Sequence, residues 1–174
     1  YKRIFPKMRW NKISKGVYFP EKVGDIVITD NDLSNLKAKE EKGRNRYCAH
    51  KYITDNIHEM MIYHKKDTVI LPHQTCNESY LILEGELDLL IYNELNEPVQ
   101  LVEMGAYGKN KVVYFRLDPP RYRAVRLVSD TLFFEVKQGP LRKESTIWAN
   151  WGTAHELKNQ VLQFCDLLKE TVDT

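Results

Sequence analysis

The stretch from Pro72 to Gly85, PHQTCNESYLILEG, decides the fold and carries the most suggestive side chains. His73 precedes a short polar loop, and Glu78 opens a run of apolar residues that ends at a hairpin corner marked by Gly85. A histidine and a carboxylate on adjacent strands of a barrel mouth can hold a divalent ion, because imidazole and carboxylate together suit iron, manganese, nickel or zinc. The stretch therefore predicts two strands with His73 and Glu78 as candidate metal ligands.

The sequence around this stretch is typical of antiparallel β-structure. Between residues 57 and 137, short apolar and aromatic runs are broken by turn residues at Pro72, 84–85, 93–98, 105–110, 118–120 and 129–130. The turns recur too often for intervening helices, so we expect about seven short strands joined by hairpins into a sandwich or barrel. Within residues 86–93, Leu87, Leu89 and Ile91 share one phase, which indicates a half-buried strand.

The two flanks of this region have a different character. Residues 1–28 mix aromatic and basic residues without sustained periodicity, so they are expected to form an extended arm. N-cap oxygens at residues 29–32 and Gly43 at a C-cap position predict a short helix over 31–42. Apolar residues near helical spacing predict an amphipathic C-terminal helix over 156–172.

At 174 residues, the chain is long enough for one domain. We expect a mainly β protein in three parts. These are an arm and short helix at 1–56 packed on the barrel, the barrel itself at 57–140, and a tail at 141–174 with Trp148, Trp151 and the C-terminal helix.

Composition and charge exclude several classes of partner. Lysine and arginine number 26 against 24 acidic residues, so charge gives no reason to expect nucleic acid as a partner. No apolar run approaches the roughly 20 residues of a membrane span. The three cysteines, Cys48, Cys76 and Cys165, are irregularly spaced and form no CxxC pair, which argues against a disulfide framework and indicates a reducing, cytoplasmic compartment.

The order of His73, Glu78 and Gly85 is similar to the first motif of the cupins, in which His-x-His, a few residues, Glu, six residues and Gly supply most of the metal ligands. This resemblance implies a single cupin-type antiparallel β-barrel, also called a double-stranded β-helix or jelly roll. Thr75 stands where the motif has its second histidine. The family's remaining histidine follows a later proline turn, where this chain has Tyr122 or Arg123. A guanidinium cannot ligate a metal and would repel one, so the resemblance implies a degenerate metal site.

More of the chain resembles the WbuC-like cupins, which are encoded with bacterial lipopolysaccharide and O-antigen genes. The likeness is carried by the Arg-rich segment 44–50 that ends in His50, by 72–85, and by 134–140 followed by 147–151. It implies a cytoplasmic cupin of surface-polysaccharide (lipopolysaccharide, O-antigen or capsule) biosynthesis, with His73 and Glu78 carried over as metal ligands. It implies no particular reaction.

Strand phase gives Arg123 a second interpretation. Arg123 shares its phase with Val125 and Leu127, so it faces the barrel interior if they do. A buried guanidinium needs an anion, which could be Glu78 or the carboxylate or diphosphate of a sugar nucleotide. The other candidate ligand-binding residues are Arg121, Tyr122, His50 and Tyr80. The plain alternatives are a solvated rim of arginines paired with acids and tyrosines that only pack.

Two further residue types need an interpretation. Cys76 could supply a third metal ligand as a thiolate, although a lone cysteine is more often a small buried apolar residue. His64 follows a strand expected over 59–63, so it is expected at the surface or at a sheet edge. His58 and His155 sit at element boundaries where no function is needed.

Three functions compete on these observations. One is a metal-dependent sugar-modifying enzyme, of isomerase, epimerase or oxygenase type, that holds one divalent ion with His73, Glu78 and Cys76. Another is a metal-free cupin that binds a saccharide or nucleotide-sugar at Arg123 and Arg121, or that uses His73 as a catalytic base beside Glu78. The last is a non-catalytic homodimeric scaffold whose arm docks on a neighbouring subunit. The sequence favours saccharide binding at a degenerate metal site and leaves enzymatic activity open.

Overall fold

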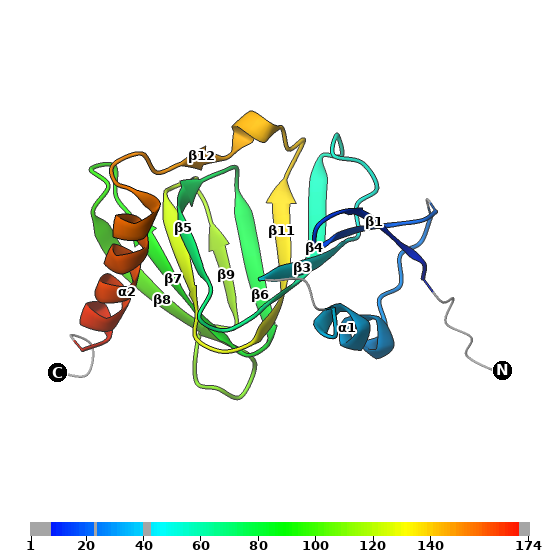
Figure 1. The fold of residues 1–174 in the computed structure, drawn as a ribbon, viewed down its shortest axis with the longest axis horizontal. Helices are drawn as coiled ribbons and strands as arrows, with labels where there is room; N and C mark the ends of the chain where they lie inside the picture. Colours follow the sequence, from blue (N-terminus) through cyan, green and yellow to red (C-terminus); the bar gives the residue numbers. More distant parts are fainter. Residues whose placement is uncertain (1–7, 23, 40–42, 171–174) are drawn as a thin grey trace.

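The computed structural model describes residues 8–22, 24–39 and 43–170, which form two β-sheets and two α-helices (Figure 1). The larger sheet, sheet A, has the strand order β1 (Trp10–Ser14), β2 (Val17–Pro20), β3 (Arg44–Cys48), β4 (Ile57–His64), β11 (Thr131–Gln138), β6 (Glu78–Glu84) and β9 (Tyr114–Leu117). The smaller sheet, sheet B, has the order β12 (Ile147–Trp148), β5 (Val69–Gln74), β10 (Arg123–Leu127), β7 (Glu86–Tyr92) and β8 (Pro98–Gly105). Of these pairings, only that of β2 with β3 is parallel.

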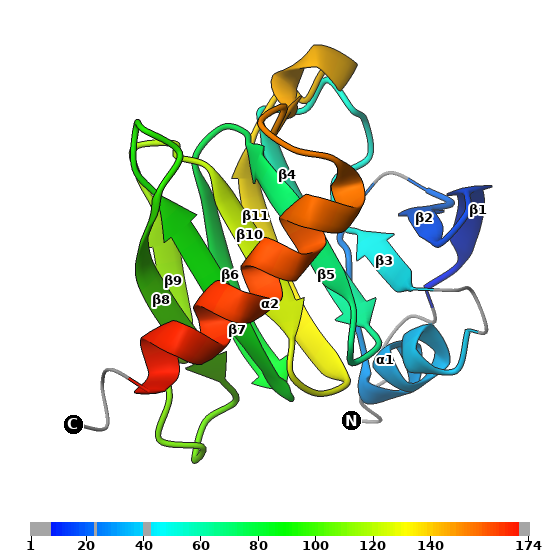
Figure 2. The same ribbon diagram turned by 60° about the vertical axis from the view of Figure 1, so that its left-hand side comes forward.

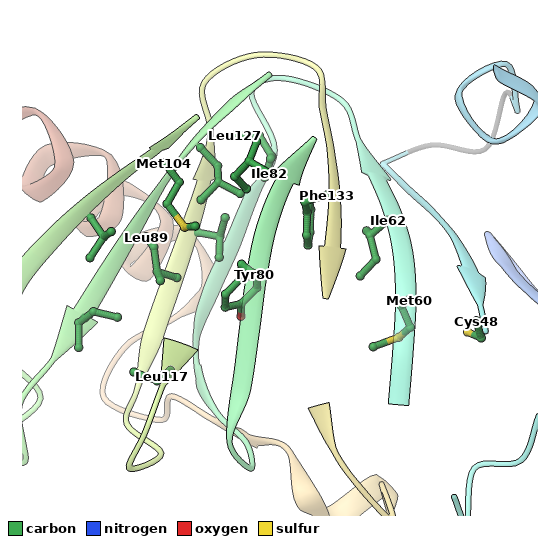
Figure 3. Packing of buried hydrophobic residues seen from close by; sticks show 14 of the residues in the cluster. Cys48, Met60, Ile62, Tyr80, Ile82, Leu89, Met104, Leu117, Leu127 and Phe133 are labelled. Atoms are coloured by element: carbon green, nitrogen blue, oxygen red, sulfur yellow. The ribbon is translucent and has the colours of Figure 1, made fainter. Parts of the chain in front are cut away.

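The apolar phases of the two sheets face each other and form the main core (Figure 3). Leu89 of β7, Leu127 of β10, Ile82 of β6 and Phe133 of β11 are among its buried members, so the expected inward phase of residues 87, 89 and 91 is confirmed. The expectation that this strand is only half-buried is wrong, because the other face of β7 is covered by the C-terminal helix and is buried too. The expected antiparallel double-sheet barrel is likewise confirmed.

Gly85 joins β6 to β7 with a φ of +81°, a conformation that favours glycine, at the predicted hairpin corner. A Cβ at this position would lie 2.2 Å from the carbonyl oxygen of Asp130. The turn therefore needs glycine for its dihedral angle and also for its close approach to the turn before β11.

Residues 57–138, all of which are described, contain eight strands rather than about seven. The missed turn separates β4 from β5 at residues 65–68, where Asp67 adopts a φ of 60° and the side chain of Asp130 accepts a hydrogen bond from the Lys66 amide. A turn was expected at Pro72 instead, but β5 runs through this proline to Gln74.

Part of the expected extended arm is a hairpin. β1 and β2 pair with each other, and β2 joins β3, so the hairpin extends sheet A. The Trp10 ring stacks on Tyr47 with a centroid distance of 4.2 Å. The remaining part of the predicted arm, residues 1–7, lies outside the described residues.

Helix α1 (Asp30–Lys37) begins at a capping box formed by Thr29 and Asp32, as the N-cap oxygens predict. It ends earlier than the predicted residue 42. The chain leaves the helix at Ala38, and the Asn45 side chain donates a hydrogen bond to the Lys39 carbonyl as the chain turns toward β3. Residues 40–42 of the predicted helix lie outside the described residues.

Helix α2 (Ala154–Glu170) lies across the outer face of sheet B (Figure 2). Three residues of the helix are buried: Leu157, Val161 and Cys165. Val161 and Cys165 form a separate hydrophobic core with Leu90 of β7 and Ala124 of β10. The helix starts two residues before the predicted start because Thr153 caps it, exchanging hydrogen bonds with Glu156. Neither described helix has the length and apolar character needed to cross a bilayer.

Between β11 and α2 the chain passes over one end of the barrel, through η1 (Lys143–Ser145) and β12, at the top of Figure 1. At this end β5 finishes and β6 begins, so it is here called the mouth. β12 pairs with β5 and places Trp148 opposite His73.

Candidate functional site

The motif residues His73 and Glu78 both lie at the mouth, and both side chains are buried. Glu78 shares the inward phase of β6 with Tyr80 and Ile82, as the alternation of the strand requires. His73 sits near the end of β5, opposite Arg123 of β10 in the ladder. The pairing of β5 with β10 therefore brings His73 into direct contact with Arg123, which lies 50 residues later in the sequence.

Arg123 is completely buried, as its phase with Val125 and Leu127 predicts. Its guanidinium forms an ion pair with Glu78 and donates hydrogen bonds to the His73 carbonyl oxygen at 2.9 Å and to Thr75 Oγ1 at 3.0 Å. Thr75 and Arg123 occupy the two positions at which the cupin resemblance lacks a histidine. Here the Arg123 guanidinium donates to the Thr75 hydroxyl, so these two side chains bind each other.

Glu78 has four polar neighbours. Arg123 and the Tyr80 hydroxyl contact Oε1, while Lys137 Nζ lies 3.1 Å from Oε2 and the Thr75 hydroxyl 3.3 Å from it. Burial alone would raise the pKa of Glu78, but the charges of Lys137 and Arg123 outweigh that effect and lower it. Glu78 is thus a carboxylate with both oxygens already satisfied by the protein.

This arrangement does not fit a metal ion. The Glu78 oxygens are occupied by two cations, and a metal near them would meet the fixed charge of Arg123. In the described ranges, no three or more His, Cys, Asp or Glu side chains are grouped in a way that could hold a metal. The metal-ligand role of His73 and Glu78 stays a prediction, and no chemistry is assigned through a metal here.

His73 is a neutral imidazole in this setting. Burial first, and then the charge of Arg123, lower its pKa to about 3. Its Nδ1 donates to the Leu71 carbonyl oxygen at 2.8 Å, which leaves Nε2 as the acceptor, and the Trp148 ring lies 4.9 Å away. An imidazole with so low a pKa is a weak proton acceptor near neutral pH, so the catalytic-base role also stays a prediction without further support.

Cys76 lies half-buried in the loop between β5 and β6. Burial is the largest influence on its thiol and raises the pKa, which disfavours the thiolate that a metal would need. Its place as a third ligand stays a prediction. All three cysteines are free.

Arg121 and Tyr122 line a cavity of about 530 Å³ at the sheet B side of the mouth. The cavity lies between the turn before β10 and the β7–β8 hairpin, with Gln74 from the end of β5. The Arg121 Nε is buried and has no hydrogen-bond partner among the described residues. The Tyr122 ring is held edge-on against Trp151 at a centroid distance of 4.9 Å. Two of the predicted ligand-binding residues therefore share one cavity.

Of the three remaining predicted ligand-binding residues, Arg123 is described above, and His50 and Tyr80 also lie away from this cavity. Tyr80 belongs to the main core, and its hydroxyl is bound to Glu78. The His50 ring packs 4.0 Å from the His58 ring and 5.2 Å from Phe19, and its Nδ1 lies 3.2 Å from the Glu59 carbonyl oxygen. Burial, followed by the neighbouring His58, lowers the pKa of His50 to about 4.

The surface position expected for His64 is wrong. His64 is 4% exposed and stacks against Phe133, because β4 runs one residue further than expected and His64 shares the inward phase of Met60 and Ile62. The arginine rim is only partly present: Arg116 pairs with Asp118 at the surface, whereas Arg126 binds the buried Asp88.

Sequence reasoning missed Lys137 and Glu135, which complete the ionic cluster around Glu78. Lys137 Nζ lies 3.2 Å from Glu135 Oε1. The missed signal was the alternation of β11, in which Phe133, Glu135 and Lys137 share one phase. An inward acid and an inward base two residues apart are expected to pair when both are buried.

Three solved structures are similar to this chain. A mutant of Bacillus subtilis oxalate decarboxylase matches with a TM-score of 0.51 and 14% identity over 72% of this chain and 34% of its own. Another oxalate decarboxylase structure, titled for its substrate binding mode and reaction specificity switch, matches with a TM-score of 0.50 and 14% identity over 63% of this chain and 29% of its own. A cupin superfamily protein from Desulfitobacterium hafniense matches at a TM-score of 0.48 and 11% identity, over 61% of this chain and 86% of its own.

The oxalate decarboxylases are cupins, so this chain has the cupin fold that its motif implies. The chain spans only about a third of the oxalate decarboxylase chains, and the low identity extends the likeness to the fold alone. A family model described as a domain of unknown function (DUF6016) matches residues 28–104, from before α1 into β8. No curated protein matches the chain.

Proposed function

We propose that this cupin binds an anionic saccharide or nucleotide-sugar, without a metal ion, in the cavity lined by Arg121 and Tyr122. The observation that carries the proposal is the buried Arg121 Nε, which has no partner in the described part of the chain and belongs to a residue lining the cavity. A buried donor on a cation is costly to leave unpaired, and a carboxylate or diphosphate oxygen would satisfy it.

The chemistry of the cavity supports a sugar ligand. Its volume of about 530 Å³ lies in the range of small-molecule sites. Tyr122 offers an aromatic ring, while Gln74 and Asn96 offer amide groups that can bind hydroxyls. The side chain of Gln74 also donates a long hydrogen bond, 3.4 Å, to the Pro120 carbonyl oxygen, which links β5 to the loop that carries Arg121.

Independence from metal is supported by the ion pair of Arg123 and Glu78. A positive group already sits against the carboxylate that the motif would offer to a metal. We therefore assign Arg123 and Glu78 to the architecture of the mouth and Arg121 to ligand binding. A role in surface-polysaccharide biosynthesis, a cytoplasmic location and a homodimer belong to the same proposal and rest on the sequence alone.

Binding assays on the full chain test the proposal. Isothermal titration with UDP-glucuronate, UDP-glucose and UDP is expected to show binding in the presence of a chelator. Arg121→Ala should weaken it at least about tenfold, because a charged hydrogen bond is lost. Arg9→Ala, which removes an exposed cation on the N-terminal side of the hairpin, should bind like the wild type. Binding that requires an added divalent ion, or that is unaffected by Arg121→Ala, would contradict the proposal.

A further inference from the structure

A separate cavity, of about 480 Å³, lies on the outer face of sheet B, at the end of the barrel opposite the mouth. The turn before β5, the start of β5 and the end of β10 form one side of it, and α2 forms the other with Lys158 and Leu162. Figure 2 shows α2 crossing the strands of this sheet obliquely. The cavity shares no lining residue with the one that holds Arg121, so a ligand bound there would be bound independently.

Strand and helix register place the lining side chains on the same side. Val69 of β5 pairs with Arg126 of β10, and Val69 packs against the separate hydrophobic core between α2 and sheet B. Lys158 and Leu162 are four residues apart on α2, so they lie on one side of the helix. Leu127 points into the main core instead and therefore borders the cavity through its backbone. One ligand can thus contact the side chains of both elements.

The walls of the cavity are largely apolar. Val69 and Leu162 are half-buried, and Val128 is 40% exposed. Arg126 adds no free charge, because two carboxylates already bind its guanidinium. An apolar hollow of this volume lies in the range of small-molecule sites, and a ligand gains free energy there by removing these side chains from water.

Two opposite charges at this cavity are uncommitted. Lys158 and Asp67 both line it, and neither side chain forms a hydrogen bond or an ion pair with any residue in the described ranges. The Asp67 backbone, in contrast, is fixed, because its N–H donates to the Leu127 carbonyl oxygen at 3.1 Å. A cation from the helix and an anion from the turn therefore border the same apolar hollow. They fit a ligand that carries both charges beside an apolar group.

We propose that this cavity binds a free α-amino acid with an apolar side chain. The carboxylate of the ligand lies at Lys158 and its ammonium group at Asp67. Its side chain packs against Val69, Val128 and Leu162. The end of a peptide carries only one of the two charges, so a free amino acid matches the pair of charges better. The site goes beyond the proposed function, because its ligand has neither a sugar nor a phosphate.

The test is an NMR titration of the isotope-labelled full chain at low ionic strength with L-phenylalanine and three analogues. Hydrocinnamate lacks the ammonium group, phenethylamine lacks the carboxylate, and glycine keeps both charges but lacks the apolar group. L-Phenylalanine is expected to bind at least about threefold more tightly than either singly charged analogue, because each loses one charged contact. Glycine should bind at least about tenfold more weakly, because it buries no apolar side chain.

Two outcomes of this titration would overturn the proposal. One is an affinity for L-phenylalanine no higher than that for hydrocinnamate, phenethylamine or glycine, and the other is no binding of L-phenylalanine at all. The largest amide shifts are expected around Asp67, Val69 and Val128. Shifts confined to the cavity of Arg121 and Tyr122 would also overturn it.

Variants test the two charges separately. Lys158→Ala and Asp67→Asn should each weaken binding of L-phenylalanine at least about threefold. Both side chains are exposed, and asparagine tolerates the φ of 60° at residue 67, so both variants are expected to fold. The matched control is Lys66→Ala, which removes a cation from the same turn but not from the cavity and should bind like the wild type.

The variants also distinguish this proposal from the first one. Binding of L-phenylalanine that survives either Lys158→Ala or Asp67→Asn overturns the amino-acid site, as does an equal loss in Lys66→Ala. Failure of UDP-glucuronate to bind would overturn only the first proposal, because the two cavities have no residue in common.

Discussion

The guanidinium of Arg123 and the carboxylate of Glu78 form an ion pair within the barrel mouth, and neither side chain is exposed to solvent. β10 supplies the cation from sheet B, and β6 supplies the anion from sheet A. The pair therefore joins the two sheets at the end of the barrel where the apolar core gives way to polar side chains. Lys137 from β11 and Thr75 from the β5–β6 loop extend this link on either side.

This position gives Arg123 a large effect on stability. We expect Arg123→Met to lower the free energy of unfolding by about 3–5 kcal/mol, because it leaves a buried carboxylate with only part of its compensation. The double variant Arg123→Met with Glu78→Gln should recover part of the loss, since no unpaired charge remains from this pair. Urea denaturation of the four proteins of the cycle measures both effects.

The outcome of this double-mutant cycle distinguishes two ways in which Arg123 can stabilise the mouth. A recovery of about 2 kcal/mol or more would indicate strong coupling between the side chains. Additive losses would instead mean that Arg123 stabilises the mouth mainly through the His73 carbonyl and Thr75, which its guanidinium also binds.

A chelator should have no effect on the folded protein. Because cations of the protein already occupy the Glu78 carboxylate, protein purified without an affinity tag is expected to contain less than about 0.1 metal ion per chain, and EDTA should leave its melting temperature unchanged. Elemental analysis and thermal unfolding check this. A near-stoichiometric transition metal, or a fall in melting temperature with EDTA, would restore the metal-dependent hypothesis.

The sequence was sufficient to predict the motif residues of the loop, but not the residues that contact them. Spacing alone indicated His73, Glu78 and Gly85, and the phase of one strand indicated that Arg123 faces inward. Which residues meet across the barrel depends on register, and a shift of one residue would turn every side chain to the other face. The contacts of Lys137 with Glu78 therefore could not be deduced, although the alternation of β11 already placed Lys137 inward.

The errors in the predicted turn positions and strand ends have similar physical causes. The turn at residues 65–68 contains no glycine or proline, and its conformation depends on Asp130, which is more than 60 residues away. For the same reason His64 was misplaced, because the end of β4 was set by its pairing with Thr131 and Arg44 rather than by local sequence.

The buried histidines predict a loss of stability in acid. The pKa values of His64 and His73 are lowered to about 3, and that of His50 to about 4, in each case chiefly by burial. Between these values and the unfolded value near 6.5, the unfolded chain binds more protons, so the free energy of unfolding must fall as the pH falls. We expect a decrease of several kcal/mol between pH 7 and pH 4, measured by urea denaturation.

His64→Phe provides the matching variant. A phenyl ring can keep the stacking on Phe133, and it loses the hydrogen bond of the His64 ring with the Gly43 backbone. This loss is offset because the buried Nδ1 of His64, which has no hydrogen-bond partner in the described chain, is removed as well. The variant should be about as stable as the wild type or more so at pH 7, and its stability should fall less steeply toward pH 4. An unchanged slope would show that His64 does not contribute to the acid sensitivity.

Substitutions at two glycines can distinguish the cost of an unfavourable dihedral angle from the cost of a steric clash. Gly85 and Gly108 have nearly the same φ, +81° and +87°, but a Cβ on Gly85 would lie 2.2 Å from the Asp130 carbonyl oxygen, whereas a Cβ on Gly108 would have no atom within 4 Å. Gly108→Ala should therefore cost about 1–2 kcal/mol from its dihedral angle alone. Gly85→Ala adds the displacement of the turn that leads into β11, so we expect about 3 kcal/mol or more. Chemical denaturation measures both losses. If they are equal, the turn at Asp130 yields freely, and the Gly of the motif serves the dihedral angle of the hairpin rather than its packing against the start of β11.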